Sequence, residues 1–144
     1  MSGGAVVGIG LDLVEVAPFA EQLGRSGTSF GEGTFTPGEL QAALDSADAG
    51  TEAFARHLAA RFAAKESFIK AWSMGRAGME PAMREVRFRE IEVACDSWGR
   101  PRLVLSGETA DAVAATLGEV EISVSLTHED SVAAAVTVIS GVCR

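Results

Sequence analysis

The sequence predicts an α+β fold in one domain, residues 1–144, with a mostly antiparallel sheet packed against a long central helix. Three observations support this class. A chain of 144 residues suits one hydrophobic core rather than two. Helical periodicity runs without a break over residues 52–74. The expected strands do not alternate regularly with helices, which argues against a parallel α/β sheet.

The first expected element is a buried strand over residues 6–16, where apolar residues alternate. One face of this strand should hold the apolar side chains of Val7, Ile9, Leu11 and Leu13. The other face holds Gly8, Gly10 and Asp12, and the two glycines should leave space beside the carboxylate.

Helices are expected next. Pro18 favours a short helix over residues 19–23, ended by Gly24, and residues 25–34 read as a loop. The segment 36–39 (TPGE) is typical of a capping box, so a helix should follow to about residue 47. The long helix then spans residues 52–74.

The last third favours a hairpin, a helix and two strands. Residues 91–94 and 101–105 flank the turn signal at 96–99. A helix should lie between Ser106 and Gly118. Strands are expected over 120–126 and 132–139, with a turn at 128–130.

Composition narrows the function classes. The net charge of −8 argues against a nucleic-acid partner, and the chain has no apolar run of about 20 residues that would cross a membrane. Residues 1–4 lack signal-peptide features, and Cys95 and Cys143 are too few for a zinc or disulfide framework, so we expect a cytoplasmic protein. Residues 56–102 contain ten basic and six acidic residues, net +4, which suits an anionic ligand, an acidic partner or an ordinary solvated face.

Two cations interrupt the apolar face of the long helix. Six residues form that face on a helical wheel: Phe54, Leu58, Phe62, Phe68, Ile69 and Trp72. Arg61 and Lys65 fall within it, one turn apart. Their long side chains can reach past the core to water, but two such interruptions favour an anion to bind.

A second strip of the long helix carries Glu66 and Lys70 beside the small residues Ala55, Ala59 and Ala63. Alone, this spacing is typical of a surface ion pair. A carboxylate in a buried strand is costly unless it is paired or metal-bound, so Asp12 favours a two-carboxylate Mg²⁺ site with Glu66. The alternative is that Asp12 caps a loop or pairs with Lys65.

The histidines are weaker signals. His128 lies at the end of a predicted strand, which indicates an auxiliary role rather than that of the base for a nucleophile. His57 is expected to be a surface residue. The chain has neither a P-loop nor a G-x-G-x-x-G motif after a strand, which disfavours an ATPase or Rossmann enzyme.

Three segments resemble the holo-[acyl-carrier-protein] synthases, the small class of 4′-phosphopantetheinyl transferases. They are residues 8–15 (GIGLDLVE), 61–71 (RFAAKESFIKA) and 125–129 (SLTHE), and the turn at 96–101 (DSWGRP) is similar too. The resemblance implies the fold of that class. It also implies transfer of phosphopantetheine from coenzyme A to a serine of an acyl carrier protein for fatty acid biosynthesis, a part of lipid metabolism, with release of adenosine 3′,5′-bisphosphate.

The resemblance also implies a homotrimer with active sites between subunits, and Mg²⁺ on Asp12 and Glu66. Catalytic roles are then expected for Glu66, Lys65 and Lys70, with Glu66 or a water on the metal as the base. The residues expected to bind coenzyme A are Arg61, Lys65, Lys70, Gly99, Arg100, Pro101, Thr127 and His128.

Two segments depart from the family pattern. Many relatives carry an Arg for the acidic carrier shortly after the strand carboxylate, where this chain has residues 17–19 (APF), so Arg25, Arg56 or Arg76 can substitute. The Gly-rich turn after the long helix is here 73–76 (SMGR). Two other functions stay open, a metal-dependent hydrolase of a nucleotide pyrophosphate and a binding module for acidic helices.

Overall fold

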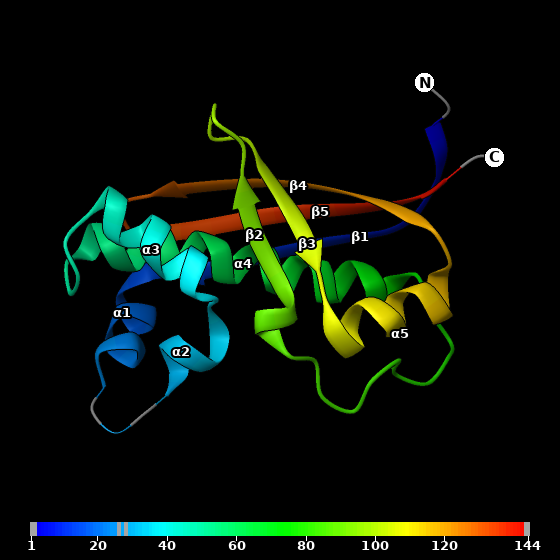
Figure 1. Cartoon of the computed structure of the whole chain (residues 1–144), viewed down its shortest axis with the longest axis horizontal. Helices are drawn as coiled ribbons and strands as arrows, with labels where there is room; N and C mark the ends of the chain where they lie inside the picture. Colours follow the sequence, from blue (N-terminus) through cyan, green and yellow to red (C-terminus); the bar gives the residue numbers. More distant parts are fainter. Residues whose placement is uncertain (1–2, 26, 28, 143–144) are drawn as a thin grey trace.

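A computed structural model describes residues 3–25, 27 and 29–142 (Figure 1). Residues 1–2 and Cys143, which the sequence analysis used, lie outside the described residues. The elements in chain order are β1 (Gly3–Glu15), α1 (Val16–Gly24), α2 (Phe30–Thr34), α3 (Pro37–Ser46), α4 (Glu52–Met74), the 3₁₀ turn η1 (Phe88–Glu90), β2 (Ile91–Cys95), β3 (Pro101–Leu105), α5 (Gly107–Leu117), β4 (Val120–Glu129) and β5 (Val132–Val142).

Helix α4 lies between two antiparallel sheets. The larger sheet has the strand order β1-β5-β4, and the β2–β3 hairpin crosses the helix on its other side (Figure 1). Phe68 of α4 shares a core cluster with Ile139 of β5 and Ile91 of β2, which joins the two sheets through the helix. The predicted α+β class is therefore confirmed. Among the described helices, none combines the length and apolar character needed to cross a membrane.

Local signals place α4 and α3 as predicted. The Thr51 hydroxyl accepts a hydrogen bond from the Phe54 amide (3.2 Å), and Gly75 follows the last turn, so α4 has its predicted limits. At α3, the Thr36 hydroxyl accepts from the Glu39 amide and the Glu39 carboxylate accepts from the Thr36 amide, which completes the predicted capping box.

The glycines of β1 have a different role from the one expected. A Cβ on Gly8 would collide with the Ala71 carbonyl, and one on Gly10 would collide with the Ser67 carbonyl. The backbone of α4 fills the space that the sequence suggested was open for a ligand. Gly8 and Gly10 therefore allow the helix to contact the strand directly.

The outer face of the larger sheet is more exposed than the sequence predicted. Ile9, Leu11 and Leu13, which were expected to be buried, are 49%, 65% and 63% exposed. In the register of the sheet, Leu11 lies opposite Val136 of β5, and Val136 lies opposite Ser125 of β4. Alternation placed these three residues on one face correctly, but no described element covers that face, and α4 packs on the other. Val7, which was expected on the same face, instead packs against the core cluster of Phe68 and Ile139, after a register shift between Val6 and Gly8.

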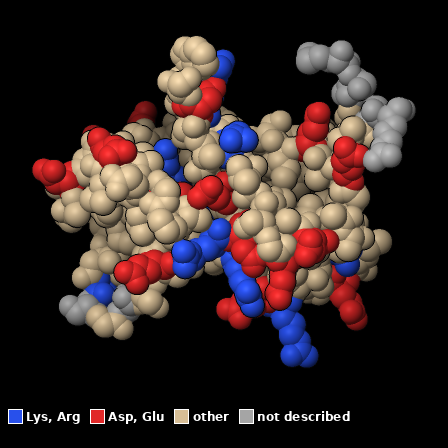
Figure 2. All heavy atoms as spheres, in the orientation of Figure 1, with Lys and Arg blue, Asp and Glu red and all other residues tan. Residues whose placement is uncertain are grey.

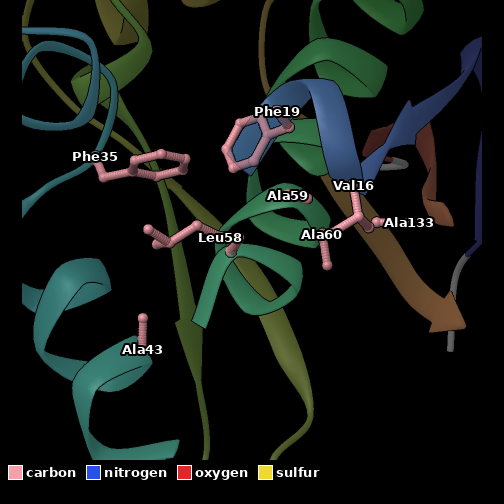
Figure 3. Packing of buried hydrophobic residues seen from close by; sticks show 9 residues of the cluster. Val16, Phe19, Phe35, Ala43, Leu58, Ala59, Ala60 and Ala133 are labelled. Atoms are coloured by element: carbon pink, nitrogen blue, oxygen red, sulfur yellow. The ribbon is translucent and has the colours of Figure 1, made fainter. Parts of the chain in front are cut away.

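Helix α1 packs on the small residues of α4. Figure 3 shows Phe19 and Val16 of α1 over Leu58, Ala59 and Ala60 of α4, with Phe35 and Ala43 on the other flank. The small side chains of Ala59 and Ala60 therefore allow α1 to approach α4 closely.

Two segments are more ordered than predicted. Residues 30–34, expected as loop, form α2, and the Phe30 ring contacts those of Phe19 and Phe62 with centroids 5.7 and 5.9 Å apart. Strand β4 extends through Glu129 because Glu129 pairs with Val132. Tertiary contacts supply the order that local propensity lacked.

Candidate active site

Asp12, Glu66 and Lys70 come together at one cleft. The cleft has a volume of about 490 Å³ and lies between β1, α1 and α4. Lys70 Nζ donates to Asp12 Oδ1 (2.9 Å) and to the Leu11 carbonyl (3.1 Å). The Asp12 side chain is 15% exposed and that of Lys70 is 53% exposed. The sequence alternative that paired Asp12 with Lys65 is therefore wrong.

The electrostatics of this cleft favour an added cation. Partial burial raises the pKa of Glu66, the nearby charge of Asp12 raises it further, and Lys70 opposes both effects. The hydrogen bond and charge of Asp12 raise the pKa of Lys70. Two carboxylates that repel each other fit a divalent metal. No group of three or more His, Cys, Asp or Glu in the described part of the chain is arranged to hold one, so waters or phosphates would complete its ligands.

Lys65 is not at this cleft, which corrects the role expected for it. Its side chain is fully buried, and Nζ donates to Glu39 Oε1 and to the carbonyls of Phe88 and Ile91, each at 2.8 Å. Burial lowers the pKa of Lys65, and the Glu39 carboxylate opposes that shift. The anion that Lys65 binds is a carboxylate of the chain itself. The sequence analysis assigned Glu39 to the capping box of α3 only. The capping box did not indicate that Glu39 would also bind Lys65.

Arg61 points away from the cleft, toward the β2–β3 hairpin. Nη1 donates to the His57 carbonyl (3.4 Å), and Nη2 lies 3.8 Å from Cys95 Sγ. Burial lowers the pKa of Arg61, while Cys95 and Glu39 raise it. Arg61 and Glu66 are five residues apart, about 140° around the helix.

The other predicted coenzyme-binding residues lie on the side of Arg61. Pro101 pairs with Cys95 next to the turn of the hairpin, and Gly99 adopts φ +79° in that turn. Arg100 Nε donates to Asp96 Oδ2 (2.6 Å), and its guanidinium stacks on the exposed Trp98 ring. Thr127 and His128 are exposed near the end of β4, opposite Ala134 and Ala133.

Apart from the buried Lys65, the expected site residues thus form two groups. Asp12, Glu66 and Lys70 are the first, and Arg61 with the hairpin and the end of β4 is the second. No residue of the second group lines the cleft of the first.

The cleft also contains residues that the sequence did not single out. Pro18, Phe19 and Gln22 of α1 and Phe62 of α4 line it. The sequence did not mark Phe19 and Phe62 as site residues, because an apolar residue on an amphipathic helix is usually part of the core.

The basic stretch 56–102 is not a continuous basic surface on the face shown. Figure 2 shows Lys and Arg side chains interspersed with Asp and Glu side chains on this face of the molecule. Arg87 contacts Glu90 and Glu108 at 3.9 and 3.8 Å. Of the expected substitutes for the carrier-docking Arg, Arg56 pairs with Glu52 (3.3 Å), Arg76 Nη2 donates to the Glu80 carbonyl (3.0 Å) and Arg25 follows α1.

His57 is half-buried rather than a plain surface residue. Burial lowers its pKa to about 4, and Arg61 and His128 add to the shift. Between pH 6.5, near the unfolded value, and pH 4, the unfolded chain binds a proton that the folded chain does not. Stability should therefore fall as the pH falls through this window.

We expect the fall in the free energy of unfolding between pH 7 and pH 4.5 to be about 1–2 kcal/mol smaller in His57→Gln. This figure is lower than the full pKa shift would give, because solvent screens the half-exposed ring. The measurement is the free energy of unfolding from pH 7 to pH 4.5. His128→Gln is the control and should keep most of the slope, because burial is the main cause of the shift. An unchanged slope in His57→Gln would contradict the assignment.

Comparisons with known proteins identify the family of the chain. Residues 8–136 match the 4′-phosphopantetheinyl transferase superfamily. The holo-[acyl-carrier-protein] synthase of Mycolicibacterium smegmatis is 56% identical over 135 residues, 94% of this chain and 97% of that protein. The same enzyme of Mycobacterium tuberculosis strain H37Ra is 51% identical over 93% of this chain and 96% of its own length.

Solved structures are similar too. The Chronobacterium ammoniagenes ACPS–CoA complex matches with a TM-score of 0.85 and 40% identity, covering 94% of this chain and 98% of that one. The acyl carrier protein synthase of Mycobacterium tuberculosis matches with a TM-score of 0.73 and 44% identity, over 96% and 100% of the two chains.

Proposed function

The chain belongs to the 4′-phosphopantetheinyl transferase superfamily, and we propose that it acts as a Mg²⁺-dependent holo-[acyl-carrier-protein] synthase. Its reaction transfers the phosphopantetheine group of coenzyme A to a serine hydroxyl of an acyl carrier protein. The observation that supports the metal dependence is the pair of carboxylates, Asp12 and Glu66, beside Lys70 at one cleft.

In this mechanism Asp12 and Glu66 would hold Mg²⁺, and the ion would supply positive charge to neutralise the pyrophosphate. Lys70 is exposed enough to turn from Asp12 to a phosphate oxygen. The serine oxygen bonds to the phosphorus that carries pantetheine, its proton passes to Glu66, and the bridging oxygen leaves on adenosine 3′,5′-bisphosphate.

We further propose that one active site uses two copies of the chain in a homotrimer. The exposed apolar row of Ile9, Leu11 and Leu13 supports self-association. The separation of Asp12 from Arg61 supports a shared site, because the cofactor-binding group of one copy can then face the metal-binding group of the next. His128 and Arg100 would belong to the same group as Arg61.

The first test is the intact mass of an apo acyl carrier protein after incubation with the chain, coenzyme A and Mg²⁺. A gain of one phosphopantetheine that EDTA abolishes is the expected result. A gain that persists in EDTA would contradict the metal dependence. Consumption of coenzyme A without any gain would instead favour the hydrolase.

Mixing two inactive variants tests the shared site. Asp12→Asn and Arg61→Ala should each be inactive alone. When the variants are co-refolded at equal amounts, about one quarter of sites should recover both groups if each site spans two copies. Activity is measured by carrier modification, with each variant refolded alone as the control. No recovery, despite mixed oligomers seen by native mass spectrometry, would contradict a site built from two copies.

A further inference from the structure

Helix α1 separates the cleft of Asp12 and Glu66 from a second hollow, which lies between α1 and the start of α4. We call this hollow the α1–α4 groove, and its volume is about 540 Å³. Four residues of α1 line the groove: Ala17, Ala20, Leu23 and Gly24. The cleft takes its α1 residues from the other side of the same helix: Pro18, Phe19 and Gln22. A molecule that reaches the cleft across α1 therefore also covers the groove.

The α1–α4 groove offers an apolar surface. Its polar side chains are already engaged, because the Thr51 hydroxyl donates to the Asp48 carbonyl (2.7 Å) and accepts from the Phe54 amide. Glu52 pairs with Arg56 at 3.3 Å. The remaining side chains of the groove are apolar. The groove therefore fits an apolar side chain of a partner better than a polar one.

The exposed side of α1, between the groove and the cleft, is acidic. Glu21 is exposed and lies about 40° around the helix from Ala17 and about 60° from Pro18. Helix α1 has no basic residue, and the exposed Glu15 lines the cleft. Residues 1–55 contain eight acidic residues and one basic residue, Arg25, which follows α1. A partner that crosses α1 therefore meets negative charge.

We propose that the acceptor carrier crosses α1 and places an apolar side chain in the α1–α4 groove while its serine enters the cleft. The two hollows are about 10 Å apart, the width of a helix, so one carrier can occupy both. Repulsion at Glu21 then selects carriers whose docking face is apolar and poor in acidic residues. This inference rests on the proposed function, because the cleft must first accept a serine.

The test compares two apo carriers that differ only in charge. One is an acidic acyl carrier protein, and the other is the same carrier with the Asp and Glu residues that flank its serine replaced by Asn and Gln. We expect the Michaelis constant of the neutralised carrier to be about three- to tenfold lower, with the turnover number within about twofold. Raising the salt from about 0.05 M to about 0.3 M should lower the Michaelis constant of the acidic carrier, because salt screens repulsion.

Reversing the charge on α1 tests the same point in the chain itself. Glu21→Arg should lower the Michaelis constant of the acidic carrier by about three- to tenfold and abolish the improvement with salt. Asp111→Arg is the matched control. It makes the same change of charge at an exposed position of α5, which lies at the other end of α4 from α1 (Figure 1), and should have less than about a twofold effect.

Filling the groove tests the apolar contact. A Cβ on Gly24 would meet no atom within 4 Å, so Gly24→Phe can add a ring at the groove without a backbone collision. We expect the Michaelis constant of the neutralised carrier to rise about tenfold, with that of coenzyme A within about twofold. Ala114→Phe adds the same ring to an exposed position of α5 and should change neither constant. If Gly24→Phe does not fold, Ala17→Phe at the exposed edge of the groove replaces it.

Four results would overturn the inference. They are equal Michaelis constants for the two carriers, a constant for the acidic carrier that rises with salt, an unchanged constant in the groove variant, and weaker use of the acidic carrier by Arg25→Ala. If both carriers are modified without the expected differences, this inference alone fails. If neither carrier is modified, the proposed function fails, and this inference fails with it.

Discussion

Glu66→Gln is expected to lower the turnover number for carrier modification by about 10²–10³-fold, with little change in stability. The substitution keeps the shape of the side chain but removes one of the two charges that would hold Mg²⁺. It also removes the proposed proton acceptor. Glu66 is only half-buried, and the partial burial that raises its pKa means that the neutral amide costs the fold little.

The measurement is turnover over a range of Mg²⁺ concentrations, with thermal unfolding as a check of the fold. Glu52→Gln is a matched control on the same helix, because Glu52 makes only an exposed contact with Arg56. If Glu66→Gln kept both its Mg²⁺ affinity and its turnover, the metal assignment would be wrong.

The largest effect on stability is expected for Lys65→Met, a loss of about 3–5 kcal/mol in the free energy of unfolding. Both side chains of the ion pair, Lys65 and Glu39, are fully buried. Removing the ammonium leaves the Glu39 carboxylate in the core without its cation. It also leaves the carbonyls of Phe88 and Ile91 without their shared donor.

Adding Glu39→Gln to Lys65→Met should recover part of this loss. The glutamine has no charge to bury, and its carbonyl can still accept from either the Thr36 or the Val93 amide. Urea unfolding of both single variants and the double variant gives the coupling energy. Lys70→Met is the contrasting control, because its ion pair is exposed and should contribute at most about 1 kcal/mol. A stable Lys65→Met with weakened coenzyme A binding would instead restore Lys65 to the active site.

Features with a local cause could be predicted from the sequence alone. The limits of α4 follow from the Thr51 cap and Gly75, and the start of α3 follows from the capping box at Thr36. The β2–β3 hairpin follows from its turn residues. The ion pair of Asp12 with Lys70 was not predicted, because the sequence offered Lys65 as the partner of Asp12.

The partners of side chains from distant segments depended on the packed structure. Helical periodicity put Lys65 on an apolar face but could not say that Glu39, twenty-six residues earlier, would meet it there. Alternation grouped Ile9, Leu11 and Leu13 correctly, yet only the approach of α4 to Gly8 and Gly10 decided which face of β1 is covered. Periodicity specifies which residues share a face, whereas the element that packs on that face is chosen by the free energy of the whole core.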